Sequence, residues 1–316
     1  MRPSTMRSTA LLAAGIALTL LPCAAWAEHG PSAQEWADSL HQVQVNGTAL
    51  AVLDLGQGEP VVFVHGSSAD YRTWLGEVES FAREHRVIAY SRRYHFPNSG
   101  GGDGRDYSRG LHEQDLLALI ETLGLGKVSL VGHASGATLA AQFAAEHPEL
   151  VRSLVLVEPS FPELMKTSSR AAEFADGRRL EFEQARQALT NGFPDIGFDA
   201  VSAWEYGDDW ESSIPRSVRV RLAQNVMALK YEVLSPVRQA PFGREQIQAI
   251  HCPVLYVDGA KSPWHARVMA DEFVKCRPAT QRVTLKSASH GLVWEDPKGF
   301  SRAVLEFFDR NLLAEE

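Results

Sequence analysis

Short runs of apolar residues recur along the chain and alternate with segments in which the apolar residues have helical spacing. Apolar runs of four or five residues, bounded by turn residues, are typical of strands that are buried on both faces. Six such strands are predicted, at residues 60–64, 86–90, 128–131, 154–157, 253–257 and 282–285. Amphipathic helices are predicted at residues 71–84, 110–123, 265–274 and 300–312. This alternation predicts an α/β fold with a mostly parallel sheet and helices on both of its faces.

Two segments depart from the alternation. Residues 42–55 alternate around Asn46-Gly47, which predicts a hairpin and brings the expected number of strands to eight. Farther along, the pattern is helical only, with helices predicted at residues 171–189, 198–210 and 218–233. A helical insertion between two strands is expected to cover the carboxyl edge of the sheet, where open α/β sheets bind ligands. We therefore expect a core at residues 28–160 and 249–316 and an all-helical cap at residues 161–248.

The first 27 residues have the composition of a cleavable signal peptide. Arg2 and Arg7 precede an apolar stretch from Leu11 to Leu21, and Ala25-Trp26-Ala27 has the small residues of a cleavage site. We expect cleavage near Ala27 and a periplasmic or secreted mature chain. The apolar stretch is short for a membrane span, which disfavours the alternative of an uncleaved anchor, so no stable membrane insertion is expected after cleavage.

The charge balance excludes some classes of partner. The chain has 31 Lys and Arg against 39 Asp and Glu, a formal net charge of −8. The predicted signal peptide holds two of the arginines and no acidic residue, so the formal net charge of the mature chain is −10. This surplus of negative charge argues against nucleic acids and anionic membrane surfaces as partners.

Two cysteines follow the predicted signal peptide, Cys252 and Cys276. Cys252 directly precedes a predicted strand and Cys276 lies at the end of the next helix, so both fall at the same edge of the sheet. In an oxidising compartment these positions favour a disulfide, which would contribute roughly 3 kcal/mol to stability; two unpaired thiols are the alternative. No group of Cys and His residues has the spacing of metal ligands, so we expect no metal and no other cofactor.

The strongest chemical signature is the turn Gly132-His133-Ala134-Ser135-Gly136, which joins a predicted strand to a predicted helix. A strand, a G-x-S-x-G turn and a helix form the nucleophile elbow of α/β-hydrolases, but the central position here is Ala134. Two further motifs accompany the turn, Val64-His65-Gly66 after an earlier strand and Ser289-His290-Gly291 after the last one. With these three motifs in this order, residues 45–312 resemble the α/β-hydrolase family.

The resemblance implies roles for several residues. His290 matches the general base of the family, and an imidazole suits that role because its pKa lies near neutrality. Glu158 directly follows the strand after the elbow and matches the acid of those relatives that carry it there, with Asp258 as the alternative. The backbone N–H groups of Ser67 and Ser135 match the oxyanion hole.

Candidates for substrate binding rest on weaker signals. Ser68 and Tyr71 follow the His65-Gly66 motif and are positioned to line a pocket. Aromatic residues of the helical segments are further candidates, namely Trp204, Tyr206, Trp210 and Trp264. For all of them, packing in the core is the alternative.

Alanine at position 134 leaves three hypotheses. In the first, the protein is an exported esterase or lactonase for small apolar substrates, with a Ser-His-Glu type triad whose nucleophile is replaced by Ala134, as in an inactivated or substrate-trapping variant. In the second, His290 acts as a base without a nucleophile, as in lyases or cofactor-free oxygenases that resemble this fold. In the third, the protein binds a small ligand without turnover. Ser135 is a weaker candidate for the nucleophile, because it begins the helix and points away from the apex of the turn.

Overall fold

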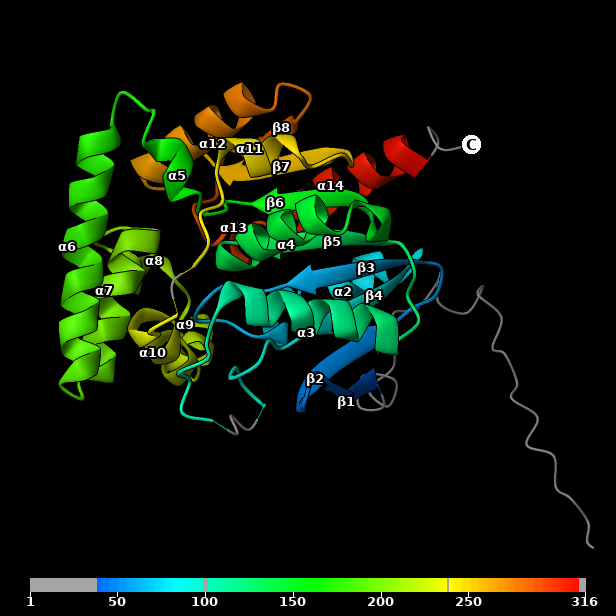
Figure 1. The fold of residues 1–316 in the computed structure, drawn as a ribbon. Helices are drawn as coiled ribbons and strands as arrows, with labels where there is room; N and C mark the ends of the chain where they lie inside the picture. The colour runs from blue at the N-terminus through cyan, green and yellow to red at the C-terminus, as the bar shows by residue number, and fades with distance from the viewer. Residues whose placement is uncertain (1–38, 99–101, 238, 313–316) are drawn as a thin grey trace, which may run out of the picture.

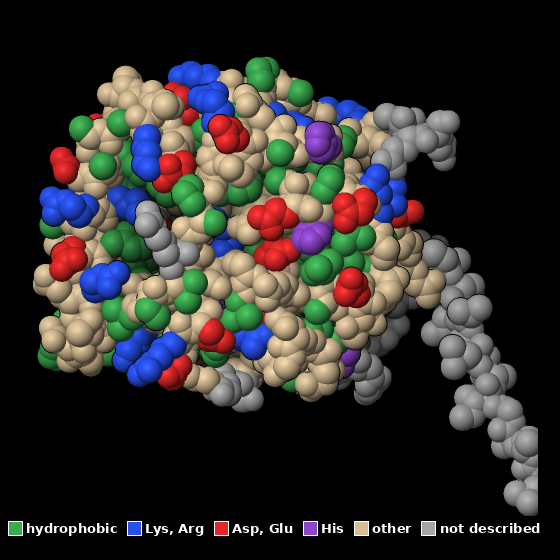
Figure 2. Space-filling view, viewed as in Figure 1, with side chains coloured by type: hydrophobic (Ala, Val, Ile, Leu, Met, Phe, Trp, Pro, Cys, Tyr) green, Lys and Arg blue, Asp and Glu red, His purple; other side chains and the backbone are tan. Residues whose placement is uncertain are grey.

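The computed structural model describes residues 39–98, 102–237 and 239–312 (Figure 1). The predicted signal peptide at residues 1–27 lies outside these ranges. None of the described helices is both long and apolar enough to cross a membrane. On the face shown in Figure 2, side chains of both charge signs are scattered among apolar ones, without a large region of one sign.

Eight strands form one sheet, as predicted, in the spatial order β1-β2-β4-β3-β5-β6-β7-β8. Their bounds are β1 Leu40–Val45, β2 Thr48–Leu55, β3 Glu59–Val64, β4 His85–Tyr90, β5 Val128–His133, β6 Val151–Val157, β7 Val254–Gly259 and β8 Gln281–Leu285. The predicted hairpin is β1 and β2, and β2 also pairs antiparallel with β4. All other neighbours are parallel, so the carboxyl ends of β3 to β8 meet at one edge of the sheet.

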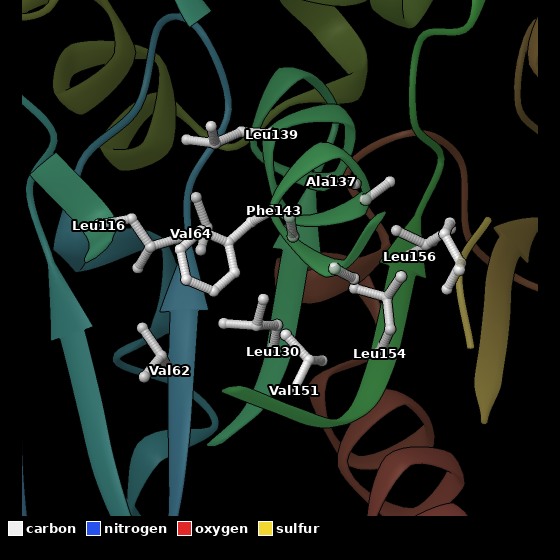
Figure 3. Close-up of a cluster of buried hydrophobic side chains, with 14 of the residues drawn as sticks. Val62, Val64, Leu116, Leu130, Ala137, Leu139, Phe143, Val151, Leu154 and Leu156 are labelled. Carbon is white, nitrogen blue, oxygen red and sulfur yellow. The ribbon is translucent and has the colours of Figure 1, made fainter. Parts of the chain in front are cut away.

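Helices cover both faces of the sheet, and a separate hydrophobic core lies under each layer. One layer contains α3 (Arg109–Thr122), α4 (Ser135–Glu146), α11 (Arg244–Gln248) and α12 (Trp264–Cys276). The other contains η2 (Tyr71–Trp74), α2 (Val78–Phe81), α13 (Leu292–Glu295) and α14 (Pro297–Leu312), and η3 (Pro148–Leu150) joins α4 to β6. Figure 3 shows Phe143 of α4 packed beside Val64 and above Leu130, all fully buried. The prediction of helices on both faces is confirmed.

A helical cap lies between β6 and β7. It consists of α5 (Pro162–Met165), α6 (Ala171–Thr190), α7 (Pro194–Tyr206), α8 (Trp210–Ser213), α9 (Arg216–Ala223) and α10 (Val226–Leu234). Helices α6 to α10 share a third hydrophobic core, whereas Leu164 and Met165 of α5 belong to the core beneath α4 and α12. In Figure 1 they stand beside the sheet at the end toward which the arrows of β6 and β7 point. The cap therefore faces the edge where the carboxyl ends of the parallel strands meet.

Two predicted helices are interrupted in the structure. The helix expected at residues 71–84 is two short pieces, η2 and α2, separated around Gly76, a residue of low helix propensity. The helix expected at residues 218–233 is divided into α9 and α10 at Asn225. The Asn225 side chain donates to Asp70 Oδ2 (2.8 Å) and accepts from the Phe96 N–H (2.8 Å), so a tertiary contact with the core holds this break.

The predicted disulfide is wrong for this structure. Cys252 and Cys276 are both free thiols. The Cys276 sulfur lies 3.7 Å from the backbone oxygen of Arg244 at the start of α11, so it faces a helix terminus. Both cysteines pack against the core beneath α4 and α12. Their positions at one edge of the sheet do not direct the two sulfur atoms toward each other.

Candidate functional site

The turn between β5 and α4 has the geometry of a strained elbow. Ala134 has a φ of 50° and a ψ of −120°, a backbone conformation that non-glycine residues rarely adopt. A Cβ atom at Gly132 would lie 2.5 Å from the Cα of Ala137, and one at Gly136 would lie 2.3 Å from the carbonyl oxygen of His65. Both glycines are therefore required by the close approach of other backbone segments. The side chain of Ala134 lines a cavity at the carboxyl edge of the sheet.

The structure brings His290 and Glu158 together beside this turn. His290 Nδ1 lies 2.7 Å from Glu158 Oε2, and both side chains are buried. The other carboxylate oxygen accepts from the Gly259 N–H (2.7 Å) and the Ser262 hydroxyl (2.5 Å). Three donors thus hold the carboxylate of Glu158 in one orientation. The alternative acid, Asp258, is instead bound to Arg282 and Thr284.

The two partners stabilise each other's charged forms. Burial opposes the imidazolium, but the hydrogen bond and charge of Glu158 outweigh burial and raise the pKa of His290 above its ordinary value. Burial likewise opposes the carboxylate, but the bonds from His290, Gly259 and Ser262 lower the pKa of Glu158. An ionised acid beside the imidazole is the arrangement that orients a catalytic histidine.

Two further rings enclose His290. His133 Nε2 donates to the backbone oxygen of His290 (2.9 Å), and the two ring centroids are 4.8 Å apart. Burial, with a smaller contribution from His290, lowers the pKa of His133 to about 3, so this neighbour is neutral. Tyr206 of the cap meets the imidazole of His290 edge-on, at 5.1 Å. Among the described residues, no group is hydrogen-bonded to His290 Nε2, although that atom is buried. The nitrogen that a general base would use is therefore available.

Ser67 and Ser135 lie together on the opposite wall. The Ser67 hydroxyl oxygen is 2.9 Å from Ser135 Oγ and 3.0 Å from Oε1 of Glu232. Because the hydroxyl has one proton, it can donate a hydrogen bond to only one of these two oxygens at a time. Arg92 donates to the Gly66 carbonyl oxygen (2.8 Å) and to Ser135 Oγ (3.3 Å). Ser135 also opens α4, where the first N–H groups of a helix have no partner within the helix. The backbone N–H of Ser135 therefore has no partner within α4.

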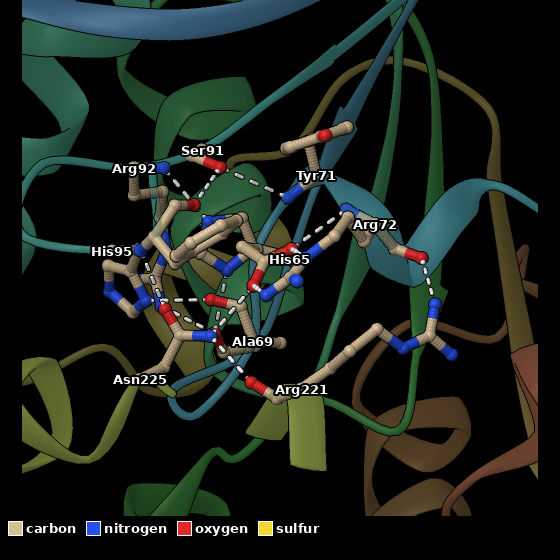
Figure 4. Close-up of polar contacts among 12 residues, drawn as sticks. His65, Ala69, Tyr71, Arg72, Ser91, Arg92, His95, Arg221 and Asn225 are labelled. Carbon is tan, nitrogen blue, oxygen red and sulfur yellow. Dashed lines mark hydrogen bonds and ion pairs between the residues drawn. The ribbon is translucent and has the colours of Figure 1, made fainter. Parts of the chain in front are cut away.

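A network of buried polar groups holds the loop that carries Ser67. Figure 4 shows His65 and His95 side by side, with Arg92 and Asn225 around them. His65 Nε2 accepts from the Arg92 N–H (2.8 Å), and His95 Nδ1 is paired with the Ala69 carbonyl oxygen (2.8 Å). Burial lowers the pKa of both histidines well below the ordinary value, so they are neutral and serve as hydrogen-bonding partners. The loop is thus positioned by the core and not by solvent contacts.

The cavity beside Ala134 has a volume of about 130 Å³ and is enclosed by the core and the cap together. The core contributes Ser67, Ala134, Ser135, Glu158, Pro159, Ser160, His265, Ala266, Met269 and His290, and the cap contributes Phe174, Arg178, Phe182, Trp204, Glu205 and Glu232. A smaller adjoining pocket shares Ser67, Ala134 and Glu205 and adds Ser68 and Tyr206. Several of these cap residues are charged, so the cavity is not uniformly apolar.

The predicted lining residues have different locations. Ser68, Trp204 and Tyr206 line the two pockets. Trp210 instead packs in the cap core, with its ring edge-on to Phe198 at 5.4 Å. The ring of Trp264 is covered by the Arg170 guanidinium at 3.6 Å, and Tyr71 packs in the core beneath α14. The structure therefore places Tyr71, Trp210 and Trp264 outside the cavity.

Three charged cap residues in the cavity were not anticipated from the sequence, namely Arg178, Glu205 and Glu232. Arg178 and Glu205 lie on α6 and α7, which also carry solvent-exposed charges, and Glu232 lies on α10. Glu232 is bound to Ser67 and to the Tyr107 hydroxyl (3.1 Å). Helical periodicity alone contains no signal that separates a cavity-facing charge from an exposed one.

One group of side chains outside the cavity has donors that suit a metal ion. Glu113, Glu146 and His147 have ligand atoms within 4.8 Å of one another, and His147 is already hydrogen-bonded to Glu113. In the described part of the chain no other such group is found. None of these three residues lines the cavity.

Comparison with known proteins gives one matching family. The sequence profile described as "Alpha/beta hydrolase family" matches residues 61–303. The putative 2-succinyl-6-hydroxy-2,4-cyclohexadiene-1-carboxylate synthase of Bacillus subtilis (strain 168) is 26% identical over 83% of this chain and 95% of its own. The putative carbamate hydrolase of Klebsiella pneumoniae (strain 342) is 26% identical over 79% of this chain and 91% of its own.

Solved structures share the fold. The enol-lactonase from Burkholderia xenovorans LB400 superposes with a TM-score of 0.67 at 18% identity and covers 85% of this chain and 100% of its own. The thermophilic esterase from Thermogutta terrifontis superposes with a TM-score of 0.70 at 20% identity and covers 86% of this chain and 99% of its own. At these identities the similarity concerns the fold and leaves the substrate open.

Proposed function

The chain belongs to the alpha/beta hydrolase family, and on this premise we propose that its cavity binds carboxylic esters or lactones in the geometry of serine hydrolysis, with Ala134 at the position of the nucleophile. The observation that carries the proposal is the bond between His290 and Glu158, which leaves Nε2 of the imidazole buried and without a partner beside the elbow. The names of the lactonase and the esterase that share this fold support the same class of substrate.

The chemistry follows from the positions of these groups. A serine at position 134 would place its hydroxyl in the cavity, transfer its proton to His290 Nε2 and attack the carbonyl carbon. Glu158 would stabilise the resulting imidazolium, and the N–H groups of Ser67 and Ser135 would bind the oxyanion. Ala134 lacks only the attacking oxygen. The protein with alanine therefore retains substrate binding and oxyanion stabilisation, which in serine proteases leave about 10³–10⁴-fold acceleration over water.

The test is the substitution Ala134→Ser, assayed with phenyl esters of short acids and with simple lactones. Loss of the nucleophile of a serine protease costs about 10⁶ in kcat. We expect the substitution to raise ester hydrolysis by about 10³-fold or more, and a second substitution, His290→Ala, to abolish the gain. A matched control is Ala266→Ser, which adds a hydroxyl to the same cavity away from the elbow and should not produce this gain. An unchanged rate in Ala134→Ser would refute the proposal.

A second candidate function is base catalysis by His290 without a covalent intermediate. The unpartnered Nε2 favours it, and one similar protein is named a synthase. Under this alternative, turnover by the chain with Ala134 disappears in His290→Gln, while Ala134→Ser adds nothing. A ligand whose saturable binding is insensitive to both substitutions would instead indicate a binding protein without turnover.

A further inference from the structure

The carboxyl group of Glu205 is the least compensated charge in the cavity. Glu205 lies near the end of α7 and lines both the main cavity and the adjoining pocket. Among the described residues, none donates a hydrogen bond to its carboxyl group or forms an ion pair with it. Its closest charged neighbours are His290, which favours the carboxylate, and Glu232, which disfavours it. Burial, the dominant effect, raises the pKa of Glu205 to about 7.

The remaining charges in the cavity do not neutralise this group. Glu158 is matched by His290 (2.7 Å), and Glu232 accepts from two neutral hydroxyl groups and also interacts electrostatically with Arg178. Arg178 is the one Lys or Arg among the described residues that line the cavity, and its guanidinium lies 4.6 Å above the ring of Phe182. With Arg178 acting on Glu232 and the buried Arg92 lying behind Ser135 outside the lining, Glu205 is the carboxyl group of the lining to which no cation is bound. A buried charge without a partner is unfavourable, so a ligand cation would be stabilised there.

Aromatic side chains form a wall of the same cavity. Phe174 and Trp204 meet edge to face at 5.7 Å, and Phe182 lies beside them in the lining. The ring of His265 stacks on Trp204 at 4.1 Å, and burial lowers the pKa of His265 to about 4, so this imidazole adds no positive charge. The faces of aromatic rings attract organic cations, and quaternary ammonium groups are bound in this way in other proteins.

We propose that the cavity selects esters whose alcohol or acyl part carries an organic cation, and that Glu205 is the residue that recognises this cation. This inference rests on the proposed ester-binding function and names the substrate class within it. An apolar substrate alone would leave Glu205 buried without a partner, whereas a quaternary or protonated amine matches both its charge and the aromatic wall. The competing outcome is a preference for an anionic ester, which the guanidinium of Arg178 would bind.

The test compares three esters of similar size by calorimetric titration of the protein with Ala134. Choline butanoate and 3,3-dimethylbutyl butanoate have the same shape and differ in one positive charge, and 4-butanoyloxybutanoate carries a negative charge. We expect choline butanoate to bind about tenfold more tightly than the neutral ester, and the anionic ester to bind most weakly. In Glu205→Gln the advantage of the cation should disappear while the affinity for the neutral ester is retained. Glu211→Gln, on the exposed side of α8, is the matched control and should leave all three affinities unchanged.

Every outcome bears on the inference. Equal binding of the cationic and neutral esters, tighter binding of the anionic ester, no binding of any ester, or a cation preference that survives in Glu205→Gln would each overturn it. The outcome is separable from that of the proposed function. If Ala134→Ser hydrolyses neutral and choline esters equally well, ester hydrolysis stands and cation selection fails. If choline butanoate binds through Glu205 but Ala134→Ser hydrolyses nothing, cation selection stands and ester hydrolysis fails. Circular dichroism and the thermal midpoint show whether each variant is folded.

Discussion

Replacing Glu158 by glutamine should reverse the direction of the hydrogen bond to the imidazole of His290. The carboxylate accepts three hydrogen bonds, from His290 Nδ1 (2.7 Å), the Gly259 N–H (2.7 Å) and the Ser262 hydroxyl (2.5 Å). A glutamine has only one oxygen, and the backbone N–H of Gly259 can only donate. The amide oxygen is therefore expected to stay with Gly259 and Ser262, and the amide NH₂ to face Nδ1. His290 then has to accept at Nδ1 and carry its proton on Nε2.

The magnitude follows from this change of tautomer. An imidazole that is protonated on Nε2 cannot take the proton of a serine at position 134, and without the neighbouring carboxylate the pKa of His290 falls. The equivalent change from Asp to Asn in a serine protease triad lowers kcat by about 10⁴-fold with the geometry intact. At 1.36 kcal/mol for each factor of ten, this is about 5 kcal/mol of lost transition-state stabilisation. We expect a loss of this size in the Ala134→Ser background.

Two measurements check the reasoning. The first is kcat for a phenyl ester in Ala134→Ser with and without Glu158→Gln. The second needs no catalysis, because ¹⁵N NMR of the imidazole in the protein with Ala134 should report a proton on Nδ1 before Glu158→Gln and on Nε2 after it. The control is Ser262→Ala, which removes one hydrogen bond but keeps the carboxylate against Nδ1, and should cost less than about tenfold. A loss of less than tenfold in Glu158→Gln, or an unchanged tautomer, would refute the reasoning.

Two further predictions concern stability. Glu77 is fully buried, and neither of its carboxyl oxygens has a hydrogen-bond partner among the described residues. Burial raises the pKa of this carboxyl group from 4.5 to about 8. Because the folded protein then holds a proton that the unfolded chain releases, the stability of the folded state should fall as the pH rises from 4.5 to 8. Glu77→Gln should therefore match the parent near pH 4 and be more stable near pH 9, by up to about 5 kcal/mol in urea denaturation, and equal stability at both pH values would contradict this. Gly136→Ala would place its Cβ 2.3 Å from the backbone oxygens of Val64 and His65 and should destabilise the protein by about 3 kcal/mol, measured by thermal unfolding. The control Gly110→Ala meets nothing within 4 Å in α3 and should stabilise by about 0.5 kcal/mol, so a similar effect at both positions would show that the elbow is not tightly packed.

The strands, the elbow and the candidate pair Glu158 and His290 were within reach of the sequence. Buried parallel strands are continuous apolar runs, and their period is local, so each strand could be recognised without its neighbours. Because β5, β6 and β7 are parallel neighbours, residues directly after them must lie at one edge. His290 follows β8, the neighbour of β7, so Glu158 and the loop containing His290 lie at this same edge, and the contact between them depends on how that loop folds.

Only the tertiary structure decided how the cap completes the site. The cap helices α6 and α7 carry both exposed charges and charges that line the cavity, and helical periodicity does not distinguish solvent from a cavity enclosed by other elements. Glu205 faces the cavity, whereas Trp210, five residues later, packs in the cap core. The direction of the thiol of Cys276 and the break at Asn225 likewise depend on contacts between segments far apart in the sequence. Local patterns in the sequence determine which segments are buried and which motif lies at the edge of the sheet. The charge and shape of the pocket arise only when the cap docks on the core, because side chains from both then line one enclosed space.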